Sequence, residues 1–282
     1  MKKLWRIPFL DMNDVIKYDF SDISIITHVR FDTEERRTNA SIRDSFYNKY
    51  CTNLEFVYVE DDTTSKLNTV LDDVGIYHLF NNSNGTRKSY CYNIGSTLTK
   101  RKYYCFLDLD CIVHPKQILK ALEYTKTDTN IGLLYPFNGT AIYLTEKIKT
   151  IFGNVLDYDV LTDILPSNIV LDYKDDNLLV GAIYAPGGCM MTRSDNFKKF
   201  KGFNPFFVGW GYEDNEIQKR VHKLGYGVSK IGGCNDLLWH LPHDGVDTPE
   251  KSAHEYYNHN MGIYNFINAA SKEDILEYMK EW

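Results

Sequence analysis

The chain has 282 residues, and its 32 Lys and Arg stand against 38 Asp and Glu, so its formal net charge is −6. This length suits one large α/β domain or two modest ones. With 43% hydrophobic and 25% charged residues, the composition excludes a fibre or a disordered chain. The acidic balance argues against a dedicated nucleic-acid binder, so no nucleic-acid partner is expected. Aromatic residues reach 14%, a surplus that core filling alone does not explain.

The N-terminus and the cysteines indicate a cytoplasmic protein. Residues 1–8 hold too short an apolar stretch for a signal peptide, and no run of about 18 apolar residues predicts a transmembrane segment. The six cysteines contain no CxxC pair. Cys105 and Cys111 flank an apolar run, which favours buried thiols over a disulfide framework. We therefore expect a cytoplasmic location, with peripheral attachment to the inner face of a membrane as the alternative.

The first part of the chain alternates predicted strands and helices. Asp32 or Thr33 can cap a helix after the first strand, and a second helix is predicted over residues 86–100. Strands separated by helices indicate βαβ units with a mostly parallel sheet, so the fold class is α/β. Runs of β-branched and apolar residues place the strands at 23–29, 54–59, 76–80 and 103–107.

The regular alternation weakens after about residue 135. Residues 153–180 are acidic and loop-rich, which predicts a solvated loop. Glycines then cluster between residues 181 and 211, a pattern typical of close backbone approaches at a substrate cleft. Because the chain holds no internal repeat and no Pro- or Ser-rich linker, we predict one domain over residues 1–248.

A C-terminal helical extension is predicted over residues 249–282. Its apolar side chains form a mixed stripe that we expect to pack on the main domain. The alternative is docking to a membrane surface or a partner enzyme, although acids outnumber lysines in the last stretch. The stripe consists of Ile275, Leu276, Tyr278, Met279 and Trp282.

Two acids, Asp108 and Asp110, follow the predicted strand at residues 103–107. In parallel α/β sheets, ligands bind beyond the carboxyl ends of the strands. In extended chain, residues i and i+2 point the same way, about 6–7 Å apart. One carboxylate could then reach a divalent cation while the other reaches a ribose hydroxyl or the same metal. The alternative is an ordinary exposed turn after a strand.

The second motif is the stretch FVGWGYEDNE at residues 207–216. Two glycines around Trp210 favour a turn that presents the indole face to a sugar ring. Glu213 and Asp214 open a predicted helix, where acids suit the positive end of the helix dipole. Capping explains one acid but not the Gly-Trp-Gly before it. A carboxylate beside the indole could take a proton from an acceptor hydroxyl.

The third motif, LWHLPHD at residues 238–244, offers His240 and His243 as nitrogen ligands for a metal. A structural histidine is the alternative for either residue. The Asp108–Asp110 pair elsewhere in the chain favours metal binding.

In this order, the three features resemble nucleotide-sugar-dependent glycosyltransferases of the GT-A fold. The likeness is greatest to inverting galactosyl- and N-acetylgalactosaminyltransferases and to the transferase modules of bacterial chondroitin-type polymerases. It runs from about residue 23 to residue 243 and is most specific over residues 186–214. The resemblance implies a mostly parallel central sheet flanked by helices. It also implies a nucleotide-binding half at about residues 20–112 and an acceptor and catalytic half at about residues 180–245.

The resemblance also implies a Mn²⁺ or Mg²⁺ site and a catalytic base. Asp110 and His240 would hold the metal, with His243 in reserve and Asp108 on the ribose or metal side. Asp214 aligns with the family's general base.

Further contacts follow from the same resemblance. Glu213 aligns with the acceptor- and sugar-contacting partner of the base, and Trp210 and Tyr212 with acceptor-binding residues. Tyr212 stands where the galactosyltransferases have glycine, which predicts a reshaped acceptor pocket. The segment 27–30 replaces a proline-led segment of the family. The donor-binding residues implied are Thr27, Arg30, Glu60, Asp61, Arg87, Lys88, Asp108, Gly187 and Gly188.

The implied activity is metal-dependent and inverting, with a role in polysaccharide biosynthesis. It moves a hexose or N-acetylhexosamine, of galactose type, from a UDP-sugar to a hydroxyl of a glycan or lipid-linked acceptor. One alternative is a carbohydrate- or nucleotide-binding protein with a degraded transferase site. Another is a sugar-phosphate nucleotidyltransferase, which would need a Gly-rich basic loop where residues 28–32 stand.

Overall fold

The computed structural model of the chain describes residues 16–67, 75–83, 85–165, 179–243 and 256–282. The expectation for residues 1–8 and the start of the C-terminal extension, 249–255, fall outside this part of the chain. No helix within the described ranges is both long enough and apolar enough to cross a lipid bilayer.

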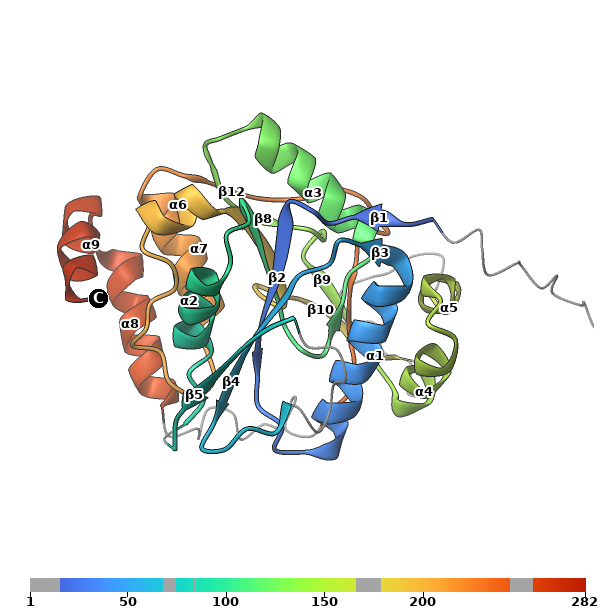
Figure 1. Cartoon of the computed structure of the whole chain (residues 1–282). Coiled ribbons are helices and arrows are strands. Elements are labelled where there is room, and N and C mark those ends of the chain that lie inside the picture. The colour runs from blue at the N-terminus through green and yellow to red at the C-terminus, as the bar shows by residue number, and fades with distance from the viewer. Residues whose placement is uncertain (1–15, 68–74, 84, 166–178, 244–255) are drawn as a thin grey trace, which may run out of the picture.

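All four predicted strands are present, and further strands accompany them (Figure 1). The predicted ones are β2 (Ile23–Val29), β4 (Phe56–Asp62), β5 (Ile76–Asn81) and β6 (Tyr103–Leu107). The others are β1 (Tyr18–Asp19), β3 (Cys51–Thr52), β7 (Cys111–Ile112), β8 (Ile131–Tyr135), β9 (Thr140–Leu144), β10 (Leu179–Tyr184), β11 (Cys189–Arg193), β12 (Gly227–Lys230) and β13 (Leu238–His240).

The two helices predicted near the N-terminus are also present. Of the two candidate caps, Thr33 is the one used, because its hydroxyl accepts a hydrogen bond from the backbone N–H of Arg36. The helices are α1 (Glu34–Tyr50), α2 (Lys88–Leu98), α3 (Pro115–Thr127), α4 (Glu146–Val155), α5 (Tyr158–Asp163), α6 (Ser194–Lys199), α7 (Glu213–Lys223), α8 (Tyr257–Ala269), α9 (Lys272–Tyr278) and the short 3-10 helix η3 (Met279–Glu281).

The main sheet has seven strands in the order β12-β8-β11-β6-β2-β4-β5. Every pair is parallel except those of β11, which runs antiparallel to β6 and β8. The prediction of a mostly parallel sheet is therefore confirmed. Strands β4 and β5 lie on one side of β2, and β6 lies on the other, so the strand order reverses between β2 and β6. In open α/β sheets, ligands bind at this switch point.

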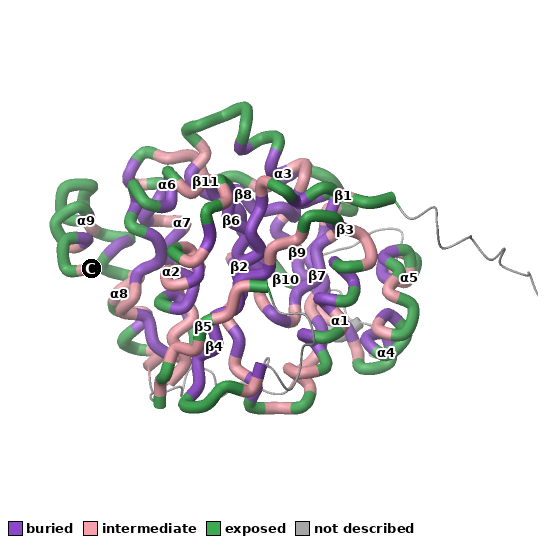
Figure 2. The backbone as a smooth tube through the Cα atoms, in the orientation of Figure 1, coloured by how far each residue is buried: buried purple, intermediate pink, exposed green. Residues whose placement is uncertain are grey.

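Helices cover both faces of the sheet. Successive side chains of β4 point to opposite faces, and apolar ones point to each, so both faces need a covering layer. Phe56 and Tyr58 face α1, where the Arg43 guanidinium lies 5.6 and 5.7 Å from their ring centres. Val57 points the opposite way, toward α2, whose Gly95 lies against it. Figure 2 shows the result as buried central strands inside a more exposed outer layer of helices.

A second, four-stranded sheet in the order β10-β9-β13-β7 was not predicted. Strands β7 and β13 have two and three residues, too few for a period of alternation to signal them. Strands β9 and β10 have five and six residues, and length does not explain why they were missed, because β6 also has five. This sheet nevertheless positions the functional site, because β7 directly follows the Asp108–Asp110 turn.

The prediction of a solvated loop over residues 153–180 is wrong for its first part. Helix α4 extends to Val155, and α5 follows with Asp157 as its N-cap. The apolar side chains of Tyr158 and Leu161 are buried there, so this segment is anchored to the core. Residues 166–178 lie outside the described ranges.

The described part of the C-terminal extension packs on the domain, at the left edge of Figure 1 beside α7. Ile275 and Met279 are buried, and the Lys201 ammonium donates hydrogen bonds to the backbone oxygens of Met279 and Trp282. Leu276 is the exception in the predicted stripe, because it remains 46% exposed.

Candidate active site

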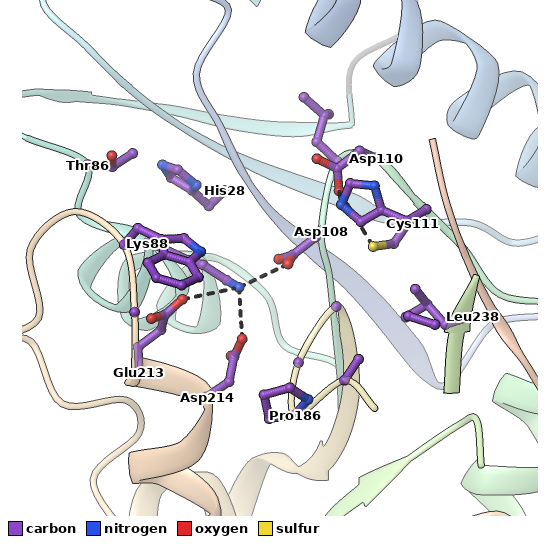
Figure 3. A pocket seen from close by; sticks show the side chains of 18 of the residues that line it. His28, Thr86, Lys88, Asp108, Asp110, Cys111, Pro186, Glu213, Asp214 and Leu238 are labelled. Carbon is purple, nitrogen blue, oxygen red and sulfur yellow. Dashed lines mark hydrogen bonds and ion pairs between the residues drawn. The ribbon is translucent and has the colours of Figure 1, made fainter. Parts of the chain in front are cut away.

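A cavity of about 840 Å³ opens at the carboxyl ends of β2 and β6, where the strand order reverses (Figure 3). Most of the predicted site residues line it, although they come from distant parts of the chain. These are Arg30, Lys88, Asp108, Asp110, Gly187, Gly188, Trp210, Tyr212, Glu213, Asp214, His240 and His243. The sequence motifs therefore converge on one cavity.

Asp110, His240 and His243 form a cluster on one side of the cavity. One nitrogen of His243 lies 2.7 Å from a carboxylate oxygen of Asp110, and Nε2 of His240 lies 3.6 Å from the other. The candidate ligand atoms of all three residues lie within 4.8 Å of one another. Burial alone would raise the pKa of Asp110, but the two imidazoles hold that pKa well below its usual range.

The second sheet brings this cluster together. Strand β7 begins directly after Asp110 and pairs with β13 in a register that sets His240 opposite Cys111. The backbone N–H of Leu241 donates to the carbonyl oxygen of Asp110 at 2.8 Å, which extends the pairing. The ring of Tyr143 stacks on His240 with centroids 4.5 Å apart and fixes its plane.

Asp108 does not join that cluster, contrary to the expectation that it shares a direction with Asp110. Strand β6 ends at Leu107, and the backbone N–H of Cys111 bonds to the carbonyl of Asp108, which closes a turn. The spacing of an extended chain therefore does not apply to the two acids. The carboxylate of Asp108 instead accepts hydrogen bonds from Lys88 and from the hydroxyl of Tyr92.

Lys88 holds three carboxylates together on the opposite side of the cavity. Its ammonium lies 2.9 Å from Asp108, 3.4 Å from Asp214 and 3.7 Å from Glu213 (Figure 3). It stands in the first turn of α2, whereas Glu213 and Asp214 open α7. Burial works against the charge of Lys88, but the surrounding carboxylates keep its pKa well above the ordinary value.

Asp214 carries the features of a general base. Burial raises its pKa to about 7, and the negative charges of Glu213 and Asp108 act in the same direction, while Lys88 opposes them. One of its oxygens, Oδ1, is buried and accepts no hydrogen bond. The side chain is 14% exposed and lines the cavity. A carboxyl group there with a pKa near 7 can take a proton from a substrate hydroxyl.

The glycine pair fits closely between the two sides of the cavity. Gly188 accepts a hydrogen bond from the backbone N–H of Asp108 at 2.9 Å, which continues the pairing of β11 with β6. Gly187 lies against the carboxylate of Asp214, since a Cβ atom built on it would come 1.8 Å from Oδ2. The backbone at Gly187 therefore limits where Asp214 can sit.

An aromatic group borders the acids. Trp210 is 47% exposed, and its ring lies nearly parallel to that of Tyr257 at 6.0 Å. The Tyr212 hydroxyl lies 2.9 Å from that of Tyr257, and its ring stacks on Tyr264. Tyr212 has φ 68°, a region that favours glycine, so ring contacts with α8 offset its backbone strain. Helix α8 thus contributes to the cavity wall.

Four predicted donor-binding residues do not line the cavity. Thr27 and Glu60 are fully buried. The Thr27 hydroxyl donates to Leu107 and accepts from a core arginine, so strand β2 turns this side chain into the protein interior. Glu60 accepts hydrogen bonds from the backbone of Lys66 and the Tyr77 hydroxyl, which ties down the chain after β4.

The other two residues are Asp61 and Arg87. Asp61 is buried behind the cavity wall, where it accepts a hydrogen bond from the backbone N–H of Arg87 at 2.6 Å. The Arg87 side chain lines a separate cavity of about 690 Å³ beside α8. Of the three basic residues proposed for the donor, Arg30 and Lys88 line the main cavity and Arg87 does not.

Sequence reasoning missed several lining residues. Arg36, His28 and Tyr257 all line the cavity. Tyr92 does not line the cavity but donates a hydrogen bond to Asp108, and it could have been found because it stands four residues after Lys88 on the same face of α2. Tyr257 gave no usable signal, since it meets Trp210 only through the packing of the C-terminal helices.

Comparison with curated proteins finds short, local similarity to galactosyltransferases. β-1,4-Galactosyltransferase 6 of Rattus norvegicus and β-1,4-galactosyltransferase 5 of Homo sapiens are each 37% identical to the chain over 57 residues. β-1,4-Galactosyltransferase 5 of Sus scrofa is 35% identical to the chain over 57 residues. Each alignment covers 20% of this chain and 15% of the relative, so the similarity concerns one segment of much longer proteins.

Two family models match the chain. One, described as the N-terminal domain of galactosyltransferase, covers residues 183–244, which include the glycine pair, the acids of α7, His240 and His243. The other, glycosyl transferase family 2, covers residues 24–200. The second match extends over more than half of the sequence and agrees with the observed sheet. The chain therefore belongs to glycosyl transferase family 2 and has the GT-A fold.

Proposed function

We propose that this protein is a metal-dependent, inverting glycosyltransferase. It transfers a hexose or N-acetylhexosamine, of galactose type, from a UDP-sugar to a hydroxyl of a glycan or lipid-linked acceptor. The observation that supports this most is that a candidate general base and a candidate metal site face each other across one cavity. Asp214, with its pKa raised to about 7 by burial, stands on one side, and the Asp110–His240–His243 cluster stands on the other.

The residues of that cluster fit a divalent cation. One carboxylate and two imidazoles are a donor set suited to Mn²⁺, whereas Mg²⁺ prefers oxygen ligands throughout. Nδ1 of His240 is buried and makes no hydrogen bond, while Nε2 faces Asp110, so neither nitrogen is committed to the fold. Small rotations would bring the three ligand atoms onto one ion. When bound, such an ion neutralises charge on a departing diphosphate.

The remaining steps belong to the chain's own residues. Asp214 takes the proton of the attacking acceptor hydroxyl, and Glu213 beside it contacts the sugars. Lys88 lines the same cavity, and its ammonium holds the carboxylates of Asp214 and Glu213 at 3.4 and 3.7 Å. Trp210 offers a half-exposed indole face on which an acceptor sugar ring can stack. Attack from the side of Asp214, opposite the leaving group, inverts the anomeric carbon.

The preference for a galactose-type donor rests on the local similarity to galactosyltransferases. The proposed cytoplasmic location rests on the thiols: all six cysteines lie in the described part of the chain, are free, and five of them are buried. Peripheral association with a membrane or with a partner enzyme remains part of the proposal.

Hydrolysis and transfer of a panel of UDP-sugars, with MnCl₂ or with EDTA, test this function. We expect release of UDP from galactose-type donors with MnCl₂ and none with EDTA, because the leaving group then lacks its counter-charge. Binding of UDP without turnover of any donor would instead indicate a nucleotide-binding protein with a degraded site. Failure to bind or turn over any UDP-sugar would contradict the proposal.

The pH dependence of the transfer should report Asp214. Only the ionised carboxylate can take a proton, and its pKa is raised to about 7, so kcat/KM should rise with pH through about 7. Below that value, we expect a fall of about tenfold per pH unit. Glu213→Gln removes a negative charge that raises the pKa of Asp214, so the rise of kcat/KM should move to lower pH. Lys88→Met removes the positive charge that lowers this pKa, so the rise should move to higher pH. A profile that stays flat through pH 7 would contradict the assignment.

A further inference from the structure

A second cluster of metal-ligating side chains lies apart from Asp110, His240 and His243. It consists of His28 at the end of β2, Asp61 in β4 and Cys91 in α2. Their candidate ligand atoms lie within 4.8 Å of one another. Three elements that are distant in sequence thus bring one nitrogen, one oxygen and one sulfur donor to a single point.

The imidazole of His28 is the part of this cluster that a solute can reach. His28 lines the main cavity, and its side chain is 11% exposed. Its Nε2 atom is buried, makes no hydrogen bond, and lies 3.4 Å from a carboxylate oxygen of Asp61. A buried ring nitrogen without a hydrogen bond is costly, and a ligand that accepts its lone pair removes that cost.

Asp61 and Cys91 are both fully buried behind His28. The Asp61 carboxylate accepts hydrogen bonds from the backbone N–H of Arg87 and the side-chain amide of Asn82, each at 2.6 Å. These two donors fix its orientation, as outer hydrogen bonds do at metal sites, and a carboxylate keeps further lone pairs for a cation.

We propose that His28, Asp61 and Cys91 bind a zinc ion. Zinc binds tetrahedrally to sulfur, nitrogen and oxygen ligands, and a thiolate ligand favours it over Mg²⁺ or Mn²⁺. The Asp110 cluster offers nitrogen and oxygen donors without a thiolate among its three residues. On binding, the Cys91 thiol loses its proton to solvent and its sulfur forms the bond to the ion. Thiolate and carboxylate together carry two negative charges, which balance the charge of Zn²⁺ in this buried place.

Cobalt titration of the full-length, metal-free, reduced protein tests the site without any assay of activity. Cobalt replaces zinc at such sites, and a thiolate ligand gives a sulfur-to-cobalt charge-transfer band in the near ultraviolet. We expect a band that saturates as cobalt is added and disappears when Zn²⁺ is added. The band should be absent in Cys91→Ala.

Two other thiols supply matched controls. Cys111 lies 3.5 Å from Asp110 and could report cobalt at the other cluster, and Cys234 is exposed. Cys111→Ala and Cys234→Ala should both keep the band. A band that is absent from the wild type, or that survives in Cys91→Ala, would overturn the proposal.

A second variant, which keeps the Cys91 thiol, distinguishes the loss of a metal ligand from misfolding of Cys91→Ala. His28→Gln removes the ring nitrogen at the cavity wall and should weaken cobalt binding about tenfold or more. Unchanged cobalt affinity in His28→Gln would overturn the proposal as well. These outcomes are independent of turnover, so the zinc site and the proposed function can fail separately.

Discussion

Replacement of Asp214 by asparagine is expected to lower the rate of sugar transfer about 10²–10⁴-fold, the usual contribution of a general base. The amide has the same shape as the carboxyl group but cannot accept the acceptor's proton. Donor affinity should change little, because Lys88 keeps Asp108 and Glu213 as partners at 2.9 and 3.7 Å. Initial rates of transfer and a calorimetric titration with UDP separate the two effects.

The matched control is Asp195→Asn, which changes an exposed acid in the first turn of another helix, α6. This variant should transfer sugar at the wild-type rate. If Asp214→Asn retained near-normal transfer, Asp214 would not be the base, and Glu213 would be the next residue to test. If it lost UDP binding together with turnover, the carboxylate would act in holding the donor.

Much of the fold followed from local sequence. The strand at residues 103–107 reads YYCFL, a short apolar run buried on both faces, and β6 has those bounds. The helix cap at Thr33 was equally local, because a hydroxyl before two acids is a common helix start. Such elements are set by residues next to one another, so a pattern of a few positions is enough to find them.

The second sheet could not be predicted for the opposite reason. Strands β7 and β13 have two and three residues and are held by strands distant in sequence, since β7 pairs with β13 and β13 also pairs with β9. Their register decides that His240 and His243 both reach Asp110. Sequence reasoning named both histidines as alternatives, whereas the structure places the two of them beside the same carboxylate.

The direction of Asp108 shows a similar limit. The spacing of Asp108 and Asp110 was read as extended chain, and the turn at the end of β6 sends the two side chains to different partners. The turn is closed locally, by the hydrogen bond from the Cys111 N–H to the Asp108 carbonyl. The partners that receive the two carboxylates, Lys88 and His243, come from distant segments, which no window around the two acids contains.

Substitution of Gly187 by alanine is expected to lower transfer about 10²-fold while the protein stays folded. The new Cβ would lie 1.8 Å from Oδ2 of Asp214 and 2.4 Å from its Cγ, so the carboxylate must move. A displacement of about 1 Å at a reacting group can cost this much. The backbone itself accepts alanine, because Gly187 is not among the glycines with positive φ. Transfer rates and thermal melting measure the two outcomes.

Gly188→Ala is the matched control, because it adds a methyl group one residue later and should act differently. Gly188 has φ 89°, and a Cβ there would lie 2.8 Å from a methyl carbon of Leu238. This conformation is strained for any residue but glycine, at a cost of about 1–3 kcal/mol. We therefore expect Gly188→Ala to lower the melting temperature. If Gly187→Ala also lowered it to the same degree, its loss of activity would be a folding effect.

The double variant Gly187→Ala, Asp214→Asn decides whether the glycine acts through the base. Each change alone removes the same element of the site, a correctly placed Asp214 carboxylate, so the two losses of rate should not multiply. With Asp214 already replaced, the added methyl group should cost far less than it does in the wild type. If the two losses multiplied instead, Gly187 would be acting on the donor or on another group of the cavity. The near contact between a backbone glycine and Asp214 would then be a feature of packing alone.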